Sequence, residues 1–203
     1  MGVIEMGKIV VVNNITLDGV TQGLGRPDED TRGGFEHGGW GIPYADQVQG
    51  EAMGKSMAQA RGILLGRRTY EDFYGYWPKQ TDNPYTEVLN QTPKYVASTT
   101  ATEPLPWQNS TLLSGDLAAK VSALRDRTDG VIAVLGSGEL VRWLAEQDLI
   151  DEYLMLIHPL VLGNGTRLFP AKGPRRPLRL TEAVVTTTGV VIATYDARAE
   201  GAA

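Results

Sequence analysis

The chain contains no cysteine and only two histidines among its 203 residues. Disulfide bonds and cysteine-ligated zinc sites are therefore excluded. His37 and His158 lie far apart in the sequence and lack the spacing of two ligands to one metal ion. The sequence consequently predicts no metal centre.

Long apolar runs and clusters of basic residues are missing as well. No apolar stretch approaches the roughly 18 residues that a membrane-spanning helix needs. The formal net charge is −5, and no basic run alternates with aromatic residues, which argues against nucleic acid as a partner. We therefore expect a cytoplasmic protein that binds neither membranes nor nucleic acid.

The chain does contain a strongly apolar segment that ends in a turn of small residues. Residues 131–135 are all apolar, as is typical of a strand buried on both faces. Residues 136–138 (Gly-Ser-Gly) interrupt this strand, and an amphipathic run from Leu140 to Leu144 follows at helical spacing. Such a junction directs backbone N–H groups and the positive end of a helix dipole at one spot, where phosphate can bind. Most single turns of this kind are plain connections, so this turn alone identifies no ligand.

A second strand–glycine–helix junction lies earlier in the chain. The apolar residues 62–65 are followed by Gly66, Arg67 and Thr69. A guanidinium fork and a hydroxyl can both donate hydrogen bonds to a phosphate. Arg67 has a competing interpretation, an ion pair with Glu71 four residues further on. The neighbouring Thr69 favours the phosphate interpretation.

The order of the predicted elements indicates an α/β fold. Strands and helices alternate through Leu149, which predicts a mixed, mostly parallel sheet with helices on both faces. Residues 178–187 and 190–195 flank a Thr-Gly turn and predict a C-terminal antiparallel hairpin. Because the sequence shows no internal repeat and no linker, we expect one domain over residues 1–203, with a core from about 8 to 197.

A glycine-rich segment between the first strand and the first helix is a candidate for covering a ligand. It runs from Gly19 to Gly41, and a loop of this length in a small domain is usually functional or mobile. Its aromatic residues Phe35 and Trp40 need a surface to cover. Residues 45–60 then place apolar side chains near one face of a predicted helix. A plain surface insertion is the alternative interpretation of the loop.

Six stretches along the chain together form a recognisable pattern. They are 16–19 (TLDG), 64–71 (LLGRRTYE), 94–98 (KYVAS), 135–138 (LGSG), 148–152 (DLIDE) and 158–169 (HPLVLGNGTRLF). In this order they resemble the dihydrofolate-reductase-like family. The resemblance is to the group similar to the C-terminal reductase domain of the bacterial riboflavin-biosynthesis deaminase–reductase.

The resemblance implies a three-layer dihydrofolate-reductase-like fold that binds NADPH along the C-terminal edge of its strands. It also implies which residues contact each part of the cofactor. These are Asn14, Asp18 and Gly19 at the nicotinamide; Gly66, Arg67 and Thr69 at a phosphate-contacting turn; Ser98 and Thr99 at the adenosine ribose and its 2′-phosphate; and Gly136, Ser137, Gly138 and Glu139 at the diphosphate.

The substrate side is less clearly marked. A reductase must supply a proton as well as a hydride, and Asp46 is the candidate acid. The competing interpretation is that Asp46 caps the N-terminus of a helix. Trp40, Tyr44 and Trp77 are candidates for a pocket that stacks on a flat ring, or for the core. We interpret His158 as a satisfied buried histidine rather than as a general acid.

Two functions remain open from the sequence. The first is an NADPH-dependent reductase that transfers hydride to a small heterocycle, such as a pterin, a pyrimidine or a flavin precursor. The second is a non-catalytic nucleotide-binding or redox-sensing protein on the same fold. No deaminase zinc signature is present, which argues against the bifunctional riboflavin enzyme itself. Proteins similar to this one are commonly homodimers, so we expect a homodimer that shares residues 153–162 or the C-terminal hairpin.

Overall fold

The computed structural model of the protein describes residues 7–198, in which eight strands form one mixed sheet. The strand order is β4-β3-β2-β5-β1-β6-β8-β7. The strands are β1 (Lys8–Thr16), β2 (Ala60–Gly66), β3 (Lys94–Ala97), β4 (Ser110–Leu113), β5 (Val131–Leu135), β6 (Glu152–His158), β7 (Arg179–Val185) and β8 (Val191–Asp196). The α-helices are α1 (Gln47–Gln59), α2 (Arg67–Tyr76), α3 (Pro84–Gln91), α4 (Leu117–Arg127) and α5 (Gly138–Glu146).

The described chain divides into two compact units. The first unit comprises residues 7–10 and 56–149, and the second comprises residues 11–55 and 150–198. The expected single domain over the whole chain stays a prediction.

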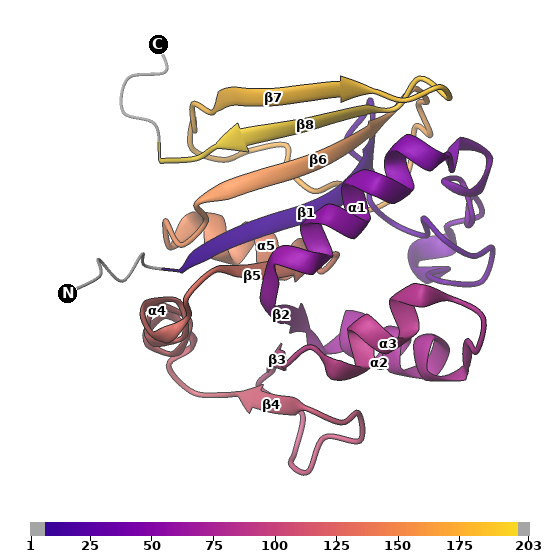
Figure 1. Ribbon diagram of the computed structural model, residues 1–203. Helices are drawn as coiled ribbons and strands as arrows, with labels where there is room; N and C mark the ends of the chain where they lie inside the picture. The colour runs from indigo at the N-terminus through magenta and orange to yellow at the C-terminus, as the bar shows by residue number, and fades with distance from the viewer. Residues whose placement is uncertain (1–6, 199–203) are drawn as a thin grey trace. The chain divides into compact units, whose positions relative to one another are not determined.

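The first unit contains four parallel strands in the order β4-β3-β2-β5. Parallel neighbours need crossover connections, and helices supply most of them. In Figure 1, α2 and α3 lie on one side of these strands and α4 lies on the other. The middles of β2 and β5 are completely enclosed, with Ile63, Leu64 and Leu65 at most 1% exposed and residues 132–134 at 0%. This confirms the prediction of a strand buried on both faces.

A fully buried lysine fastens α3 to the start of β3. The ammonium of Lys94 donates to the carbonyl oxygens of Leu89 (2.7 Å), Asn90 (3.2 Å) and Thr92 (2.9 Å) at the end of the helix. It also lies 4.6 Å from the centre of the Trp107 ring. Burial lowers the pKa of Lys94 to about 8. The three carbonyl oxygens and the ring stabilise its charged form, so the ammonium acts as a cap for α3.

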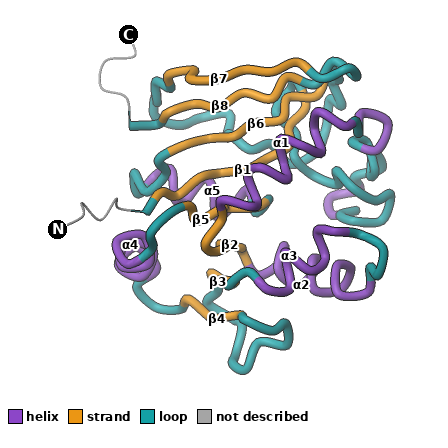
Figure 2. Tube along the Cα trace, in the orientation of Figure 1, coloured by secondary structure: helices purple, strands orange, loops and turns teal. Residues whose placement is uncertain are grey.

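The second unit contains the antiparallel strands β6, β8 and β7. Strands β7 and β8 form the predicted C-terminal hairpin, although β7 is shorter than expected because pairing stops at Val185. Between β1 and α1 the chain is mostly loop, interrupted by the short 3-10 turns η1 (Arg32–Gly34) and η2 (Ile42–Tyr44), as Figure 2 shows. All seven residues of β7 are exposed.

The observed elements confirm the predicted fold class, a mixed and mostly parallel α/β sheet with a C-terminal antiparallel hairpin. Element boundaries differ from the prediction by one to three residues, because helix and strand ends depend on pairing and capping. Asp116 is the residue that caps α4, by accepting a bond from the Ala119 N–H. Within residues 7–198, none of the helices combines the length and apolar character that crossing a membrane requires.

Candidate functional site

The candidate site in the first unit begins where three neighbouring parallel strands end. Strand β2 lies between β3 and β5, and the pairing aligns Gly66 with Ala97 and Leu64 with Val134. Parallel strands end at a common edge, and such edges carry the ligands in open α/β sheets. The structure therefore brings together the strand ends that carry the predicted turns at residues 66–69, 98–99 and 136–139.

A single hydroxyl connects two of these turns. Ser137 Oγ accepts a hydrogen bond from the Gly66 N–H (2.8 Å) and donates one to Thr69 Oγ1 (2.8 Å). Because the Thr69 oxygen accepts here, its own proton is left to donate elsewhere. A Cβ added at Gly66 would lie 3.3 Å from Ser137 Oγ, so the close approach of the two turns favours glycine. The Ser137 hydroxyl therefore joins the two turns into one braced structure.

The backbone of the second turn has an unusual conformation. Gly136 has φ +57° and Ser137 has φ +56°, in the left-handed region that side chains disfavour. For Ser137 this conformation costs free energy, and such strain is concentrated at functional sites. A Cβ on Gly136 would lie 3.3 Å from Thr69 Cγ2. The turn thus depends on contacts with residue 69, which lies on a different strand–helix junction.

The two helices that begin at this edge have N-termini that no side chain caps. Among the helices that the structure describes, α3 is capped by Asn83 and α4 by Asp116. The N-cap residues of α2 and α5 are Gly66 and Ser137, and neither makes a side-chain capping bond. The Ser137 hydroxyl, which would be the natural cap, is used for Gly66 and Thr69 instead. The first N–H groups of a helix need an acceptor, and a phosphate at such a site also benefits from the helix dipole.

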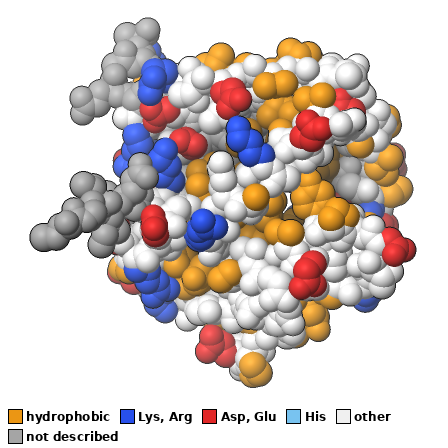
Figure 3. Space-filling view, in the orientation of Figure 1, with side chains coloured by type: hydrophobic (Ala, Val, Ile, Leu, Met, Phe, Trp, Pro, Cys, Tyr) orange, Lys and Arg blue, Asp and Glu red, His pale blue; other side chains and the backbone are white. Residues whose placement is uncertain are grey.

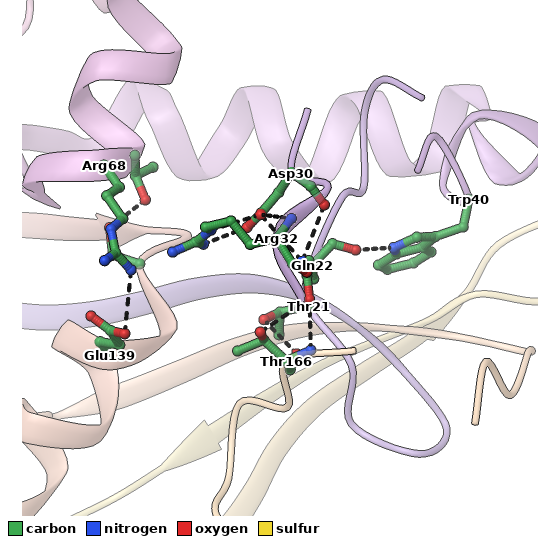
Figure 4. A network of polar contacts seen from close by, with 10 residues as sticks. Thr21, Gln22, Asp30, Arg32, Trp40, Arg68, Glu139 and Thr166 are labelled. Atoms are coloured by element: carbon green, nitrogen blue, oxygen red, sulfur yellow. Dashed lines mark hydrogen bonds and ion pairs between the residues drawn. The ribbon is translucent and has the colours of Figure 1, made fainter. Parts of the chain in front are cut away.

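Two arginines flank the turns. Arg67 Nη1 lies 2.9 Å from both carboxylate oxygens of Glu71, so the ion pair considered from the sequence is present. Arg68 Nη1 lies 3.6 Å from Glu139 Oε1, and Figure 4 shows the two side chains facing each other. Exposed pairs of this kind contribute about 0–1 kcal/mol. A phosphate could therefore replace either carboxylate at little cost, and the phosphate role of Arg67 stays a prediction.

The third strand end supplies hydroxyl groups. Ser98 Oγ accepts from the N–H groups of Thr100 (3.1 Å) and Ala101 (2.9 Å), which shapes the turn after β3. Thr99 is exposed beside it. Both hydroxyl groups retain their protons as donors. Their proposed contact with a 2′-phosphate stays a prediction.

In the second unit, Asp18 fastens the turn after β1 to the segment after β6. Its carboxylate accepts from Thr16 Oγ1 (2.6 Å) and from the N–H groups of Leu162 (3.2 Å) and Gly163 (3.0 Å). The guanidinium of Arg167 adds a contact at 3.3 Å. Burial opposes ionisation, but the hydrogen bonds outweigh it and lower the pKa of Asp18 to about 2. The Asp18 side chain therefore orients this loop.

Gln22 organises the glycine-rich loop, a role that no pattern in the sequence indicated. Its side-chain NH₂ donates to the carbonyl oxygens of Asp30 (3.1 Å) and Arg32 (3.0 Å), and its oxygen accepts from the N–H (2.9 Å) and hydroxyl (3.0 Å) of Thr166. The Trp40 indole N–H donates to the Gln22 carbonyl oxygen (2.6 Å). Figure 4 shows these side chains converging on Gln22. The loop is consequently held by specific bonds and is not a loose insertion.

The aromatic residues predicted for the substrate side have defined surroundings. The rings of Trp40 and Tyr44 meet the ring of His158 edge to face, with centroids 5.0 and 5.4 Å away. Trp40 is 6% exposed and packs in the core with Val20 and Phe35. In the first unit, Trp77 belongs to a separate aromatic cluster that comprises Phe73, Tyr76 and Tyr85. Their predicted role in binding substrate stays a prediction.

His158 is completely buried at the end of β6, as we expected from the sequence. The expectation that it is fully satisfied is wrong, because its Nδ1 has no hydrogen-bond partner among the described residues. Its Nε2 lies 2.9 Å from Asn14 Oδ1. Burial lowers the pKa of His158 to about 4, so the ring is neutral at physiological pH. A neutral, enclosed imidazole is not suited to donate protons to a substrate.

Asp46 has the geometry of a helix cap. Its Oδ1 accepts from the Gln49 N–H (2.8 Å) in the first turn of α1, and its Oδ2 accepts from the N–H (2.7 Å) and hydroxyl (2.9 Å) of Thr187. The Gln49 N–H bond is the largest cause of a lowered pKa of Asp46, and Thr187 lowers it further. A carboxylate with this environment is ionised at neutral pH. These bonds favour the capping interpretation, and the acid role stays a prediction.

No group of three or more His, Cys, Asp and Glu residues within 7–198 could hold a metal ion. The polar groups found at the candidate site are backbone N–H groups, hydroxyls and guanidinium groups, which are ligands for anions.

The chain matches one protein family over most of its length. Residues 7–193 match the family described as the RibD C-terminal domain. The protein YyaP of Bacillus subtilis (strain 168) is 30% identical over 139 residues, which cover 66% of this chain and 72% of that protein.

Solved structures show the same fold. A putative riboflavin biosynthesis protein from Shewanella sp. PV-4 has a TM-score of 0.69 at 20% identity and covers 95% of this chain and 99% of its own. A pyrimidine reductase-like protein from Corynebacterium diphtheriae has a TM-score of 0.66 at 13% identity, with coverages of 96% and 93%. Dihydrofolate reductase from Enterococcus faecalis, complexed with NADP(H), has a TM-score of 0.61 at 13% identity, with coverages of 96% and 98%. The fold is therefore dihydrofolate-reductase-like, and the chain belongs to the RibD C-terminal domain family, a reductase-type family.

Proposed function

We propose that the protein is an NADPH-dependent reductase that transfers hydride to a small heterocycle of the pterin, pyrimidine or flavin-precursor type. The observation that carries the proposal is the braced pair of turns at Gly66 and Ser137, where two uncapped helix N-termini open at one sheet edge. Membership of a reductase-type family supports the same conclusion.

The residues of the first unit fit the phosphate groups of the cofactor. The N–H groups at the starts of α2 and α5 and the free proton of Thr69 supply donors for the diphosphate. Arg67, Ser98 and Thr99 supply a charge and hydroxyls for the 2′-phosphate, which distinguishes NADPH from NADH. An acidic protein with net charge −5 needs such local donors to hold this anion.

In the second unit, we assign the nicotinamide to the C-terminal end of β1 and to the turn that follows this strand. Asn14 is only partly buried, and the left-handed Gly19 (φ +81°) forms the turn that Asp18 holds in place. NADPH supplies the hydride when it is bound. The residues of this unit orient the ring and exclude water, and Trp40 and Tyr44 are proposed to line the substrate pocket. The substrate contact of Trp77, which belongs to the first unit, stays a prediction.

A non-catalytic nucleotide-binding or redox-sensing protein is the second candidate. The environment of Asp46 favours it, because both carboxylate oxygens already accept hydrogen bonds and the pKa of Asp46 is lowered. Without another acid, proton delivery would depend on water. Both candidates require NADPH binding, and turnover with a heterocycle separates them.

A fluorescence titration with NADPH and NADH tests the cofactor assignment. We expect NADPH to bind more tightly than NADH. Arg67→Ala should lower the affinity for NADPH by about ten-fold or more, because a charge-assisted hydrogen bond is lost. Arg61→Ala is the matched control, since this exposed arginine lies near the opposite end of β2. Equal binding of the two nucleotides, or no binding, would refute the assignment.

We also propose a homodimer formed through β7. This strand ends the sheet order, and its Leu180, Val184 and Val185 are 53%, 41% and 66% exposed. Figure 3 shows hydrophobic side chains gathered over this strand, at the top of the view. An open strand edge with exposed apolar residues is a surface on which a second copy can pair. Light scattering at micromolar concentration should give about twice 22.0 kDa, and Val185→Lys should give the monomer mass.

A further inference from the structure

His158 is a buried polar residue that neither the fold nor the hydride transfer explains. It is 0% exposed at the end of β6, and its one hydrogen bond among the described residues joins Nε2 to Asn14 Oδ1 at 2.9 Å. No described residue hydrogen-bonds to Nδ1. An unsatisfied buried nitrogen costs free energy, so its presence calls for a reason.

The hydrogen bond to Asn14 determines the tautomer of the ring. An amide oxygen only accepts, so Nε2 must carry the proton and Nδ1 is a bare lone pair. The same bond determines the orientation of the Asn14 amide. Because Oδ1 is directed at His158, the NH₂ end is the part of the side chain that remains for another partner.

Several contacts hold the imidazole in this position. Trp40 and Tyr44 meet the ring edge to face, at interplanar angles of 89° and 82°. Trp40 is itself fixed by its bond to the Gln22 carbonyl oxygen, and the Tyr44 carbonyl oxygen accepts from Thr188 Oγ1 (2.7 Å). The ring therefore has little freedom to turn and release Asn14.

We propose that His158 is a positioning residue that fixes the Asn14 carboxamide with its NH₂ group directed at the carboxamide oxygen of the nicotinamide. This inference rests on the proposed function, which places the nicotinamide beside Asn14. The unsatisfied Nδ1 is then the consequence of using the Nε2 proton to set the donor end of Asn14. Asn14 touches the cofactor, and His158 acts only through Asn14.

The inference predicts that stability and cofactor recognition separate in His158→Phe. Phenylalanine fits between the aromatic rings of Trp40 and Tyr44 and removes the unsatisfied nitrogen, so the melting temperature should be kept or raised. Asn14 then loses its fixed orientation, and NADPH affinity should fall about three- to ten-fold, the value of one neutral hydrogen bond. His158→Gln places an amide NH₂ where Nε2 was and should restore most of the affinity.

Two chemical probes locate the effect on the cofactor. Adenosine 2′,5′-bisphosphate lacks the nicotinamide, so it should bind equally well to the wild type and to His158→Phe. Thionicotinamide NADPH presents a sulfur, a weaker acceptor, and the wild type should bind it several-fold more weakly than NADPH. His158→Phe should lose this discrimination. Nitrogen-15 NMR of the imidazole should show the Nε2–H tautomer, and His37→Gln, at the exposed second histidine, assigns the signals and serves as the control.

The outcomes distinguish the inference from the function on which it rests. If the wild type binds no NADPH, the proposed function fails and the inference fails with it. If the wild type binds NADPH and His158→Phe retains both affinity and discrimination, only the inference is overturned. An equal loss of bisphosphate affinity, or an Nδ1–H tautomer, would also overturn it. If His158→Phe does not fold, two measurements still test the inference. They are the imidazole tautomer of the wild type and the discrimination of His158→Gln between NADPH and thionicotinamide NADPH.

Discussion

Replacing Ser137 tests whether one hydroxyl braces the candidate phosphate site. Its Oγ joins Gly66 N and Thr69 Oγ1 at 2.8 Å each, and its backbone is in the left-handed region at φ +56°. Ser137→Ala removes the hydroxyl and keeps the unfavourable conformation. Ser137→Gly removes the hydroxyl as well, but it also relieves the conformation, so the two variants separate the two effects.

The structure gives the expected magnitudes. Losing Oγ leaves the partly buried Gly66 N–H without its partner, which costs about 1–3 kcal/mol of unfolding free energy in both variants. A left-handed conformation costs a non-glycine residue about 1–2 kcal/mol, so glycine recovers roughly 1 kcal/mol of this. We therefore expect the free energy of unfolding to be highest for the wild type, lower for Ser137→Gly and lowest for Ser137→Ala, with about 1 kcal/mol between the two variants. This reverses the usual order, since glycine in the middle of a helix or strand lowers protein stability by about 0.5–1 kcal/mol relative to alanine.

Urea unfolding of the three proteins measures these differences, and NADPH titration measures the effect on the site. Ser114→Ala and Ser114→Gly are the matched controls, because Ser114 is exposed and its backbone is not left-handed. Both Ser137 variants should bind NADPH more weakly to a similar degree, although their stabilities differ. An alanine variant as stable as the glycine variant would refute the strain argument. Wild-type NADPH affinity in both variants would refute the bracing of the site.

Two further predictions concern aspartates. The lowered pKa of Asp18, about 2 against 3.8, means that its hydrogen bonds stabilise the fold above pH 4 and are lost as the pH falls from about 4 to 2. Asp18→Asn should therefore lower the unfolding free energy at pH 7 by roughly 1–2 kcal/mol. Urea titrations at several pH values should show this difference from the wild type vanishing towards pH 2. A difference that stays constant with pH would contradict the prediction. Asp46→Asn retains an acceptor for the Gln49 N–H, so NADPH affinity should be unchanged and turnover with an identified substrate should persist, whereas a large loss of turnover alone would establish Asp46 as the acid.

Local sequence patterns were sufficient to predict most of the helices and strands and their order. The strands at 60–66 and 131–135 were predictable because a continuous apolar run followed by glycine is a local signal that few other structures satisfy. The same locality made the turns at Gly66 and Gly136 candidates for anion binding, and that role stays a prediction. Parallel pairing then follows from the alternation with helices, so the common edge of β2, β3 and β5 was also implied.

The sequence left open every choice between two uses of one side chain. Arg67 could pair with Glu71 or bind phosphate, and Asp46 could cap a helix or act as an acid. The structure shows the ion pair within α2 and the cap at the start of α1, and the β7–β8 turn brings Thr187 to Asp46 as a further partner. Thr187, which completes the partners of Asp46, lies 141 residues away and has no signal in the sequence.

Only the tertiary structure revealed the residues that brace the site. Ser137 reaches Thr69 across 68 residues, Gln22 reaches Thr166 across 144, and His158 reaches Asn14 across 144. The two members of each pair lie far apart in the sequence, so composition and periodicity cannot show that they are partners. Their roles arise because burial removes water as an alternative partner, and a polar group without water must bond to whatever the fold places beside it.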